Sequence, residues 1–135
     1  MKLMSLIQTA VAGVVLFGAV AQAETVRANI PFAFLAGDQL MPAGTYTVNL
    51  DRARSLMSLN SGTETARVIA FNSEFGKGNE PGMLLFHKYG DQYLLTRVKT
   101  SGTREGFEVA PGRSAREAIR RGGAFEVAMV MFQTR

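Results

Sequence analysis

Short stretches in which apolar and polar residues alternate recur along the sequence after residue 24, and turn-forming residues separate them. A period of two places successive side chains on opposite faces of a β-strand, so each stretch predicts a half-buried strand. A parallel α/β fold would need helices between such strands, and the pattern offers none there. We therefore expect an all-β fold, an antiparallel β-sandwich or small β-barrel of about seven or eight short strands with one short C-terminal α-helix. The predicted strands include residues 25–30, 45–50, 56–59, 65–71, 83–89, 92–99 and 124–132.

The first 23 residues have a different character. Lys2 is the only charged residue before Glu24, and the uncharged stretch between them ends in Ala21-Gln22-Ala23. A basic start, an apolar middle and a small-x-small ending are typical of a secretory signal peptide. We predict that residues 1–23 are a signal peptide and that residues 24–135 form one β-rich domain, periplasmic or extracellular. The alternative is an uncleaved anchor, because an apolar helix of this length could span a bilayer core of about 30 Å.

The sequence contains no Cys and one His, and its formal net charge is +4. The lack of Cys excludes a disulfide scaffold, a thiol nucleophile and thiolate metal sites, so the apolar core alone must stabilise an exported domain. A mild positive charge without a dense basic cluster does not indicate nucleic-acid binding. We predict no metal, no cofactor and no membrane span once the leader is removed.

The dipeptide Gly90-Asp91 separates two strand-like stretches and gives the clearest hairpin signal in the sequence. A two-residue turn with Gly in first place accepts a positive φ. Both faces of this hairpin are apolar away from the turn, so we expect it to lie inside the sheet, or beneath a helix or second sheet. In a regular register Tyr89 opposes Gln92, Lys88 opposes Tyr93 and His87 opposes Leu94, while Arg97 shares the face of Phe86 and Val98 shares the face of His87.

One helix is predicted near the C-terminus. Ser114 and Glu117 match a capping box, in which each side chain accepts a hydrogen bond from an unpaired backbone N–H at the helix start. Glu117 and Arg121 are spaced for a helical ion pair, and Gly122-Gly123 ends the helix. Its arginines could contact an anionic envelope component, such as lipid headgroups or an acidic polymer, or could form an ordinary solvated face. These arginines are Arg113, Arg116, Arg120 and Arg121.

The last strand-like stretch, Ala124–Phe132, has no charged residue after Glu126 and contains no strand breaker. A strand of this kind is prone to aggregate when it is exposed. We therefore expect it to lie inside the sheet or to pair with another chain. Self-association or strand addition through residues 124–132 is the corresponding functional hypothesis.

Catalytic motifs are scarce. His87 could combine with Asp51 or Asp91 and a serine, but no Gly-x-Ser-x-Gly elbow presents a serine nucleophile. A His in the middle of a strand is typically an ordinary sheet residue. A glycosidase-like pair of carboxylates cannot be placed from spacing alone. We predict no catalytic residue, although loop carboxylates are present at Glu74, Glu80, Glu105 and Glu108.

Side chains around the Gly90-Asp91 turn form a candidate binding surface. Aromatic rings beside a turn could stack against a sugar, and the alternative is ordinary cross-strand pairing. The residues of this predicted surface are His87, Lys88, Tyr89, Asp91 and Tyr93.

Four motifs resemble a group of small exported bacterial proteins of the acidobacterial type. They are Ile30-Pro31-Phe32-x-Phe34-x-Ala36-Gly37, Leu40-x-Pro42-Ala43-Gly44-x-Tyr46-x-Val48, Phe86-His87-Lys88-Tyr89-Gly90-Asp91-Gln92-Tyr93-Leu94 and Ser114-x-x-Glu117. The resemblance covers nearly all of residues 24–135. It implies export and a β-rich fold, and it carries no activity or catalytic residue with it.

Three functions follow as hypotheses. The one we favour is an exported β-domain, not an enzyme, that acts by binding or structural association in the cell envelope, with an envelope protein, a polysaccharide or a second copy as partner. The second is a binding module for a carbohydrate or a small apolar ligand. The third is a hydrolase that uses His87 or a pair of carboxylates.

Overall fold

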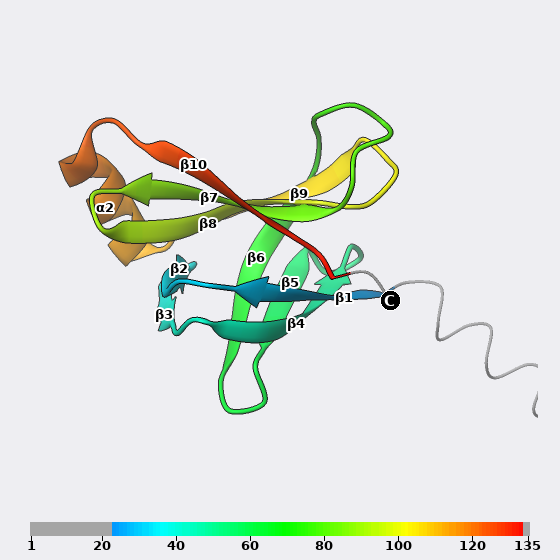
Figure 1. The fold of residues 1–135 in the computed structure, drawn as a ribbon, viewed down its shortest axis with the longest axis horizontal. Coiled ribbons are helices and arrows are strands. Elements are labelled where there is room, and N and C mark those ends of the chain that lie inside the picture. Colours follow the sequence, from blue (N-terminus) through cyan, green and yellow to red (C-terminus); the bar gives the residue numbers. More distant parts are fainter. Residues whose placement is uncertain (1–22, 134–135) are drawn as a thin grey trace, which may run out of the picture.

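The computed structural model describes residues 23–133, and these form ten β-strands and one α-helix (Figure 1). The β-rich class with a short C-terminal helix is confirmed, while the predicted number of strands is too low. The strands are β1 (Ala23–Ile30), β2 (Phe34–Ala36), β3 (Gln39–Met41), β4 (Gly44–Asp51), β5 (Leu56–Asn60), β6 (Thr65–Glu74), β7 (Met83–Tyr89), β8 (Gln92–Lys99), β9 (Glu105–Val109) and β10 (Glu126–Met131), and the helix is α2 (Arg113–Gly122).

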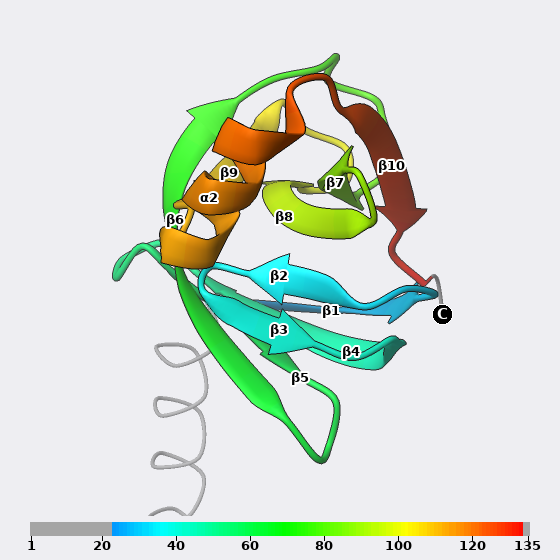
Figure 2. The ribbon, with the colours of Figure 1, turned by 90° about the vertical axis from the view of Figure 1, so that its left-hand side faces the viewer.

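All ten strands belong to one sheet. Its order is β1-β4-β5-β6-β9-β8-β2-β3, and β7 pairs with both β8 and β10. Strand β6 links two halves of the sheet, because Thr65–Ile69 pairs with β5 whereas Ala70–Glu74 pairs with β9. The sheet bends along β6, so that β1, β4 and β5 lie across the core from β7, β8 and β10 (Figure 2). Strand β2 runs parallel to β8, so the sheet is mixed and the expectation of a purely antiparallel fold is wrong.

The sheet is open, and a closed barrel is therefore also wrong. Strands β1 and β10 converge at the C-terminal end of β10 (Figure 2). They meet there through one isolated antiparallel bridge, between Ala28 and Phe132. If that register continued, Pro31 would lie opposite Met129, and proline has no N–H to donate to a neighbouring strand. Pro31 could therefore donate no hydrogen bond to Met129, which is consistent with the absence of pairing beyond the bridge within residues 23–133.

The core between the two halves is built around aromatic rings. Phe34, Tyr46 and Phe86 are fully buried, and the Phe34 ring meets each of the other two edge-on at a centroid distance of 5.4 Å. The Tyr46 hydroxyl donates a hydrogen bond to the carbonyl of Pro42, which satisfies the one polar group of the ring. Three of the motifs that carry the family resemblance thus supply core and turn residues.

The β7–β8 hairpin has the predicted pairs around its turn and lies inside the sheet, as expected. Farther from the turn the register shifts, because Thr96 is an extra residue between two paired positions. The Thr96 hydroxyl donates to the carbonyl of Leu85 at 3.1 Å. This β-bulge reverses the predicted faces beyond it: Val98 is fully buried, and Arg97 points outward to an ion pair with Glu108 at 3.6 Å.

The predicted capping box is wrong. Helix α2 begins after Gly112, which provides no side-chain cap, and Ser114 lies in the first turn. The backbone N–H of Ser114 donates instead to the carboxylate of Asp38, in the turn between β2 and β3, at 2.9 Å. The helix packs through Ala115 and Ala118 on a small apolar cluster that also contains Leu35, Tyr89 and Leu94.

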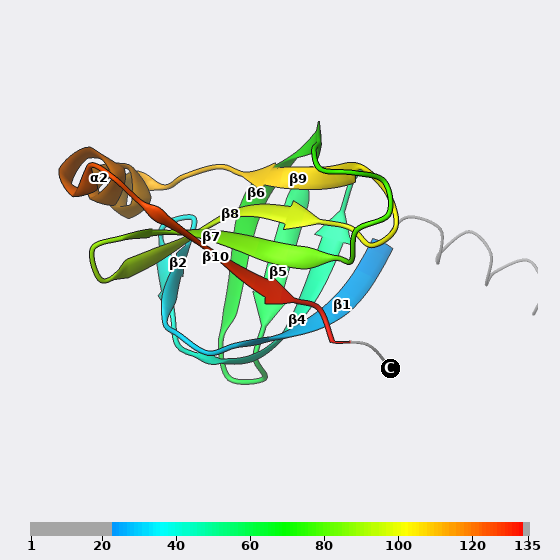
Figure 3. The same cartoon turned by 45° about the horizontal axis from the view of Figure 1, so that its top comes forward.

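Strand β10 lies at an edge, so the expectation that it is inside the sheet is wrong. It pairs along its whole length with β7, from Glu126 opposite Lys88 to Met131 opposite Met83. Figure 3 shows it running obliquely past β7 toward β1. Pairing with another chain, the other half of that expectation, stays a prediction.

Candidate functional site

The directions of the β10 backbone groups follow from two hydrogen bonds just beyond its end. Phe132 donates its N–H to the carbonyl of Gly82, next to β7, at 3.2 Å, and Gln133 donates its N–H to the carbonyl of Arg27, on β1, at 2.8 Å. Successive residues of an antiparallel strand direct these groups alternately to its two sides. The even-numbered residues of β10 therefore pair with β7, and the odd-numbered residues direct their N–H and C=O groups to the other side.

That other side of β10 is the open edge of the sheet. Within residues 23–133, no strand pairs with it between Glu126 and Met131. An edge of unpaired N–H and C=O groups is a template for another strand, and proteins usually protect it with charges, proline or a covering segment. The residues whose backbone groups lie at the open edge are Val127, Met129 and Met131.

The side chains of the same residues point outward and form an apolar strip with Phe125. Val127 and Met129 are 58% and 59% exposed, and Phe125 and Met131 are exposed as well. Their inward neighbours Ala128 and Val130 pack on the core. This strip of large apolar side chains lies beside an open edge, and exposed apolar surfaces of this kind mark interaction sites.

His87, the one histidine of the sequence, lies beside this apolar strip. Its ring stacks on Phe125 at a centroid distance of 4.1 Å and an angle of 17°. Burial lowers the pKa of His87 below its usual value, and the nearby Arg97 guanidinium lowers it further. The imidazole is thus neutral near pH 7 and is held by aromatic packing.

A cleft of about 670 Å³ lies between the β7–β8 turn, the C-terminal end of α2 and strands β2 and β3. It brings together part of the predicted binding surface, namely Tyr89, Asp91 and Tyr93, with Arg121 of the helix. His87 and Lys88 do not line it. The exposed Leu40 side chain adds an apolar wall.

The two tyrosine rings of that surface are already packed against protein. Tyr93 stacks on Phe32 at a centroid distance of 3.7 Å, and the Lys88 ammonium lies 5.5 Å from the same ring. Tyr89 is only 9% exposed and contacts the Phe125 ring at 5.4 Å. A sugar stacking on either ring would have to displace these neighbours.

The helix arginines divide between two sides of α2. Arg113, Arg116 and Arg120 are separated by three and four positions, which places them on one side, whereas Arg121 lines the cleft. All four are exposed, and Arg116 donates to the carbonyl of Pro111 at 3.0 Å. The ion pairs between described residues involve other arginines. In particular, the predicted pair of Glu117 with Arg121 is not among them.

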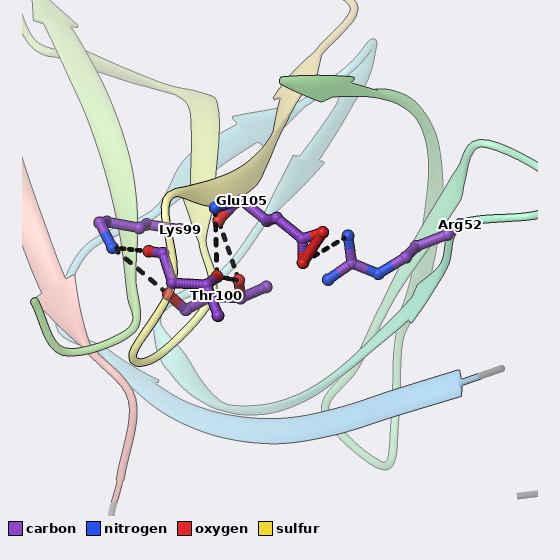
Figure 4. Close-up of polar contacts among 5 residues, drawn as sticks. Arg52, Lys99, Thr100 and Glu105 are labelled. Atoms are coloured by element: carbon purple, nitrogen blue, oxygen red, sulfur yellow. Dashed lines mark hydrogen bonds and ion pairs between the residues drawn. The ribbon is translucent and has the colours of Figure 1, made fainter. Parts of the chain in front are cut away.

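Lys99 is a buried charged residue that the sequence did not single out. It is 2% exposed, and its ammonium donates to the carbonyls of Thr103 at 2.5 Å and Thr100 at 3.4 Å (Figure 4). The turn that it braces leads into Glu105, whose carboxylate pairs with Arg52 at 3.6 Å. The sequence around a lysine at the end of an apolar strand does not indicate whether its ammonium group is buried or exposed.

Glu74 lies opposite Glu105 in the β6–β9 pairing, and both line a cleft of about 510 Å³ with Arg52. The other two candidate carboxylates make separate contacts. Glu108 pairs with Arg97, and Glu80 accepts the backbone N–H of Lys77 at 2.6 Å. In the part of the chain that the structure describes, no group of three or more His, Asp or Glu side chains could hold a metal ion.

Comparison with protein-family models, curated proteins and solved structures finds no match to this chain. The predicted signal peptide, residues 1–23, lies outside the described residues except for Ala23. Helix α2, the one helix among residues 23–133, is not long and apolar enough to cross a bilayer.

Proposed function

We propose that this is an exported, non-catalytic β-domain that acts by structural association in the cell envelope, and that two copies associate through the open edge of β10. The observation that carries the proposal is the open edge itself, flanked by the apolar strip. The leader-like residues 1–23 and the resemblance to exported bacterial proteins support export. In this proposal the bent sheet is a sandwich-like frame that holds β10 at the surface.

A second copy can pair with the open edge in an antiparallel register centred on Ala128. With Ala128 on the two-fold axis, Val127 lies opposite Met129 of the other copy, and Phe125 lies opposite its Met131. These are odd-numbered residues, so each pair can exchange two backbone hydrogen bonds. Apolar side chains then oppose apolar side chains throughout the outer face.

The residues at the ends and centre of this register also suit self-pairing. Ala128 would meet its own copy in a pair without hydrogen bonds, where Cα atoms approach to about 4.5 Å and the small Ala side chain is easily accommodated. Glu126 would oppose Val130 and avoid the other Glu126. The register ends before Phe132, because Phe132 already forms an antiparallel bridge with Ala28 on that side. These features favour a second copy over an unrelated strand.

The mass of the protein in solution, measured by light scattering during gel filtration, tests this proposal. Met129→Pro removes an N–H from the open edge without removing one from the β7 ladder, so it should convert the dimer into a monomer. Met129→Leu keeps the N–H and should stay dimeric. Val127→Pro is a second variant of the same kind. A wild-type protein that is monomeric at high concentration would contradict the proposal whatever the variants do.

A second candidate function is the binding of a carbohydrate or small apolar ligand in the cleft beside α2. The observation that favours it is the meeting of exposed Leu40 with Arg121 and Asp91 around one concave space. A glycan array with the wild type should give a signal that Leu40→Ser combined with Arg121→Gln removes. Both side chains are exposed, so a lost signal would reflect lost binding and not unfolding of the protein. An absent signal, or one that survives both changes, would count against the cleft.

A further inference from the structure

A basic stripe and the apolar strip lie on neighbouring parts of one outer face. The basic stripe consists of Arg113, Arg116 and Arg120 on one side of α2. Helix α2 contains four arginines against one glutamate, so its field is positive. Figure 2 shows α2 and β10 on either side of β7.

Residues of α2 and β7 lie between the two features. Ile119 is exposed and lies on the side of α2 next to the basic stripe. It lines a second cleft of about 210 Å³ together with His87 of β7. His87 in turn stacks on Phe125, at the start of the apolar strip. Guanidinium groups, Ile119 and the stacked rings of His87 and Phe125 thus lie in succession on the way to Val127 and Met129, with the small cleft between Ile119 and His87.

We infer that this face docks on an anionic lipid surface of the cell envelope. Guanidinium groups bind phosphate through paired hydrogen bonds, and exposed apolar side chains beside them can enter the boundary between headgroups and acyl chains. An acidic polysaccharide would engage the arginines but would leave Val127 and Met129 in water. The combination of both kinds of side chain favours a bilayer.

The inference deepens the proposed function, since it names the envelope component with which the domain associates, but it does not rest on the β10 pairing. Edge-to-edge pairing of antiparallel strands continues one sheet, so the outer faces of both copies would point the same way. A dimer would thus present the basic stripe and the apolar strip twice to the same surface, and multivalent attachment strengthens binding.

Vesicle sedimentation tests the inference on protein purified after export, with its N-terminus fixed by intact mass. The protein should sediment with vesicles of equal parts phosphatidylcholine and phosphatidylglycerol, and not with phosphatidylcholine alone. Replacing Arg113, Arg116 and Arg120 by Gln should weaken binding by more than about tenfold. The matched control replaces the exposed Arg27, Arg67 and Arg104 by Gln and should change binding much less. Val127→Ser with Met129→Ser should also weaken it, because the apolar contact is lost.

Three outcomes would overturn the inference. They are equal sedimentation with both kinds of vesicle, equal losses in the two triple-arginine variants, and binding to a soluble acidic polysaccharide in place of vesicles. The oligomeric state and the vesicle binding of the wild type, measured together, separate the two proposals. A wild type that is monomeric yet binds anionic vesicles disproves the β10 pairing alone, whereas a dimer that ignores them disproves the lipid surface alone.

Discussion

The carboxylate of Asp38 accepts a hydrogen bond from the backbone N–H of Ser114, 76 positions away in the sequence. A turn between two short strands thereby caps the start of α2. The bond, together with the positive charges of Arg113 and Arg116, keeps the pKa of Asp38 below its usual value of 3.8. Since α2 buries only two alanines of its own, this tertiary cap is a principal attachment of the helix.

Replacing Asp38 by Ala should loosen α2 without unfolding the sheet. The amide of Ser114 loses its acceptor, and the negative charge that favours a helix N-terminus disappears. Amide hydrogen exchange should become faster across residues 113–122 while the β4 and β5 amides keep their rates. Unchanged exchange in α2 would show that the cap contributes nothing.

The same cap should depend on pH in one direction. The folded pKa of Asp38 is depressed, so the stabilisation is complete above the unfolded value of 3.8 and is lost as the pH falls through the lower folded pKa. The difference in stability between wild type and Asp38→Ala, measured by urea unfolding, should shrink below pH 3.8. A difference that grows on acidification would contradict this.

His87 should produce a second pH effect, at a higher pH. Its folded pKa lies below 6.5, so the unfolded chain binds a proton that the folded chain does not, and the folded state loses stability as the pH falls below 6.5. The chain has one His, so His87→Gln should remove this dependence. The urea concentration at the midpoint of unfolding should be measured for the wild type and for His87→Gln as a function of pH. A wild-type midpoint that rises on acidification across pH 6.5 would contradict the burial of a neutral ring.

Lys99→Met should destabilise the protein by about 1–3 kcal/mol, because the carbonyls of Thr100 and Thr103 lose the ammonium that satisfies them. Lys77→Met, at an exposed loop position, is the control and should change the unfolding free energy by less than about 0.5 kcal/mol. Equal effects of the two changes would mean that burial of Lys99 has no energetic consequence.

Local signals in the sequence predicted local structure well. The Gly90-Asp91 turn fixes which residues oppose each other next to it, so the pairs of Tyr89 with Gln92 and Lys88 with Tyr93 were predictable. The bulge at Thr96 was not predictable from the sequence. It is accompanied by a hydrogen bond from the Thr96 hydroxyl to the carbonyl of Leu85, and an extra residue in a strand has no periodic sequence pattern. Strand β9 was missed as well, since its short length and Gly106 leave little alternation to detect.

Contacts between distant segments were beyond the sequence. Ser114 and Glu117 carry the pattern of a capping box, but Asp38 approaches the same N–H from another turn and replaces the local cap. In the same way, composition marked residues 124–132 as a strand that needs a partner. It could not show that one side of β10 stays without a partner strand within residues 23–133, because that depends on how β1 meets β10.

The pairing of two copies through β10 can be measured by hydrogen exchange along that strand, followed residue by residue at high and low protein concentration. The amides of Ala128 and Val130 face β7 and should be protected at every concentration. If two copies pair through the open edge, the amides of Val127 and Met129 should be protected in concentrated samples and should exchange rapidly on dilution. Rapid exchange of Val127 and Met129 at all concentrations, beside protected Ala128 and Val130, would contradict the pairing.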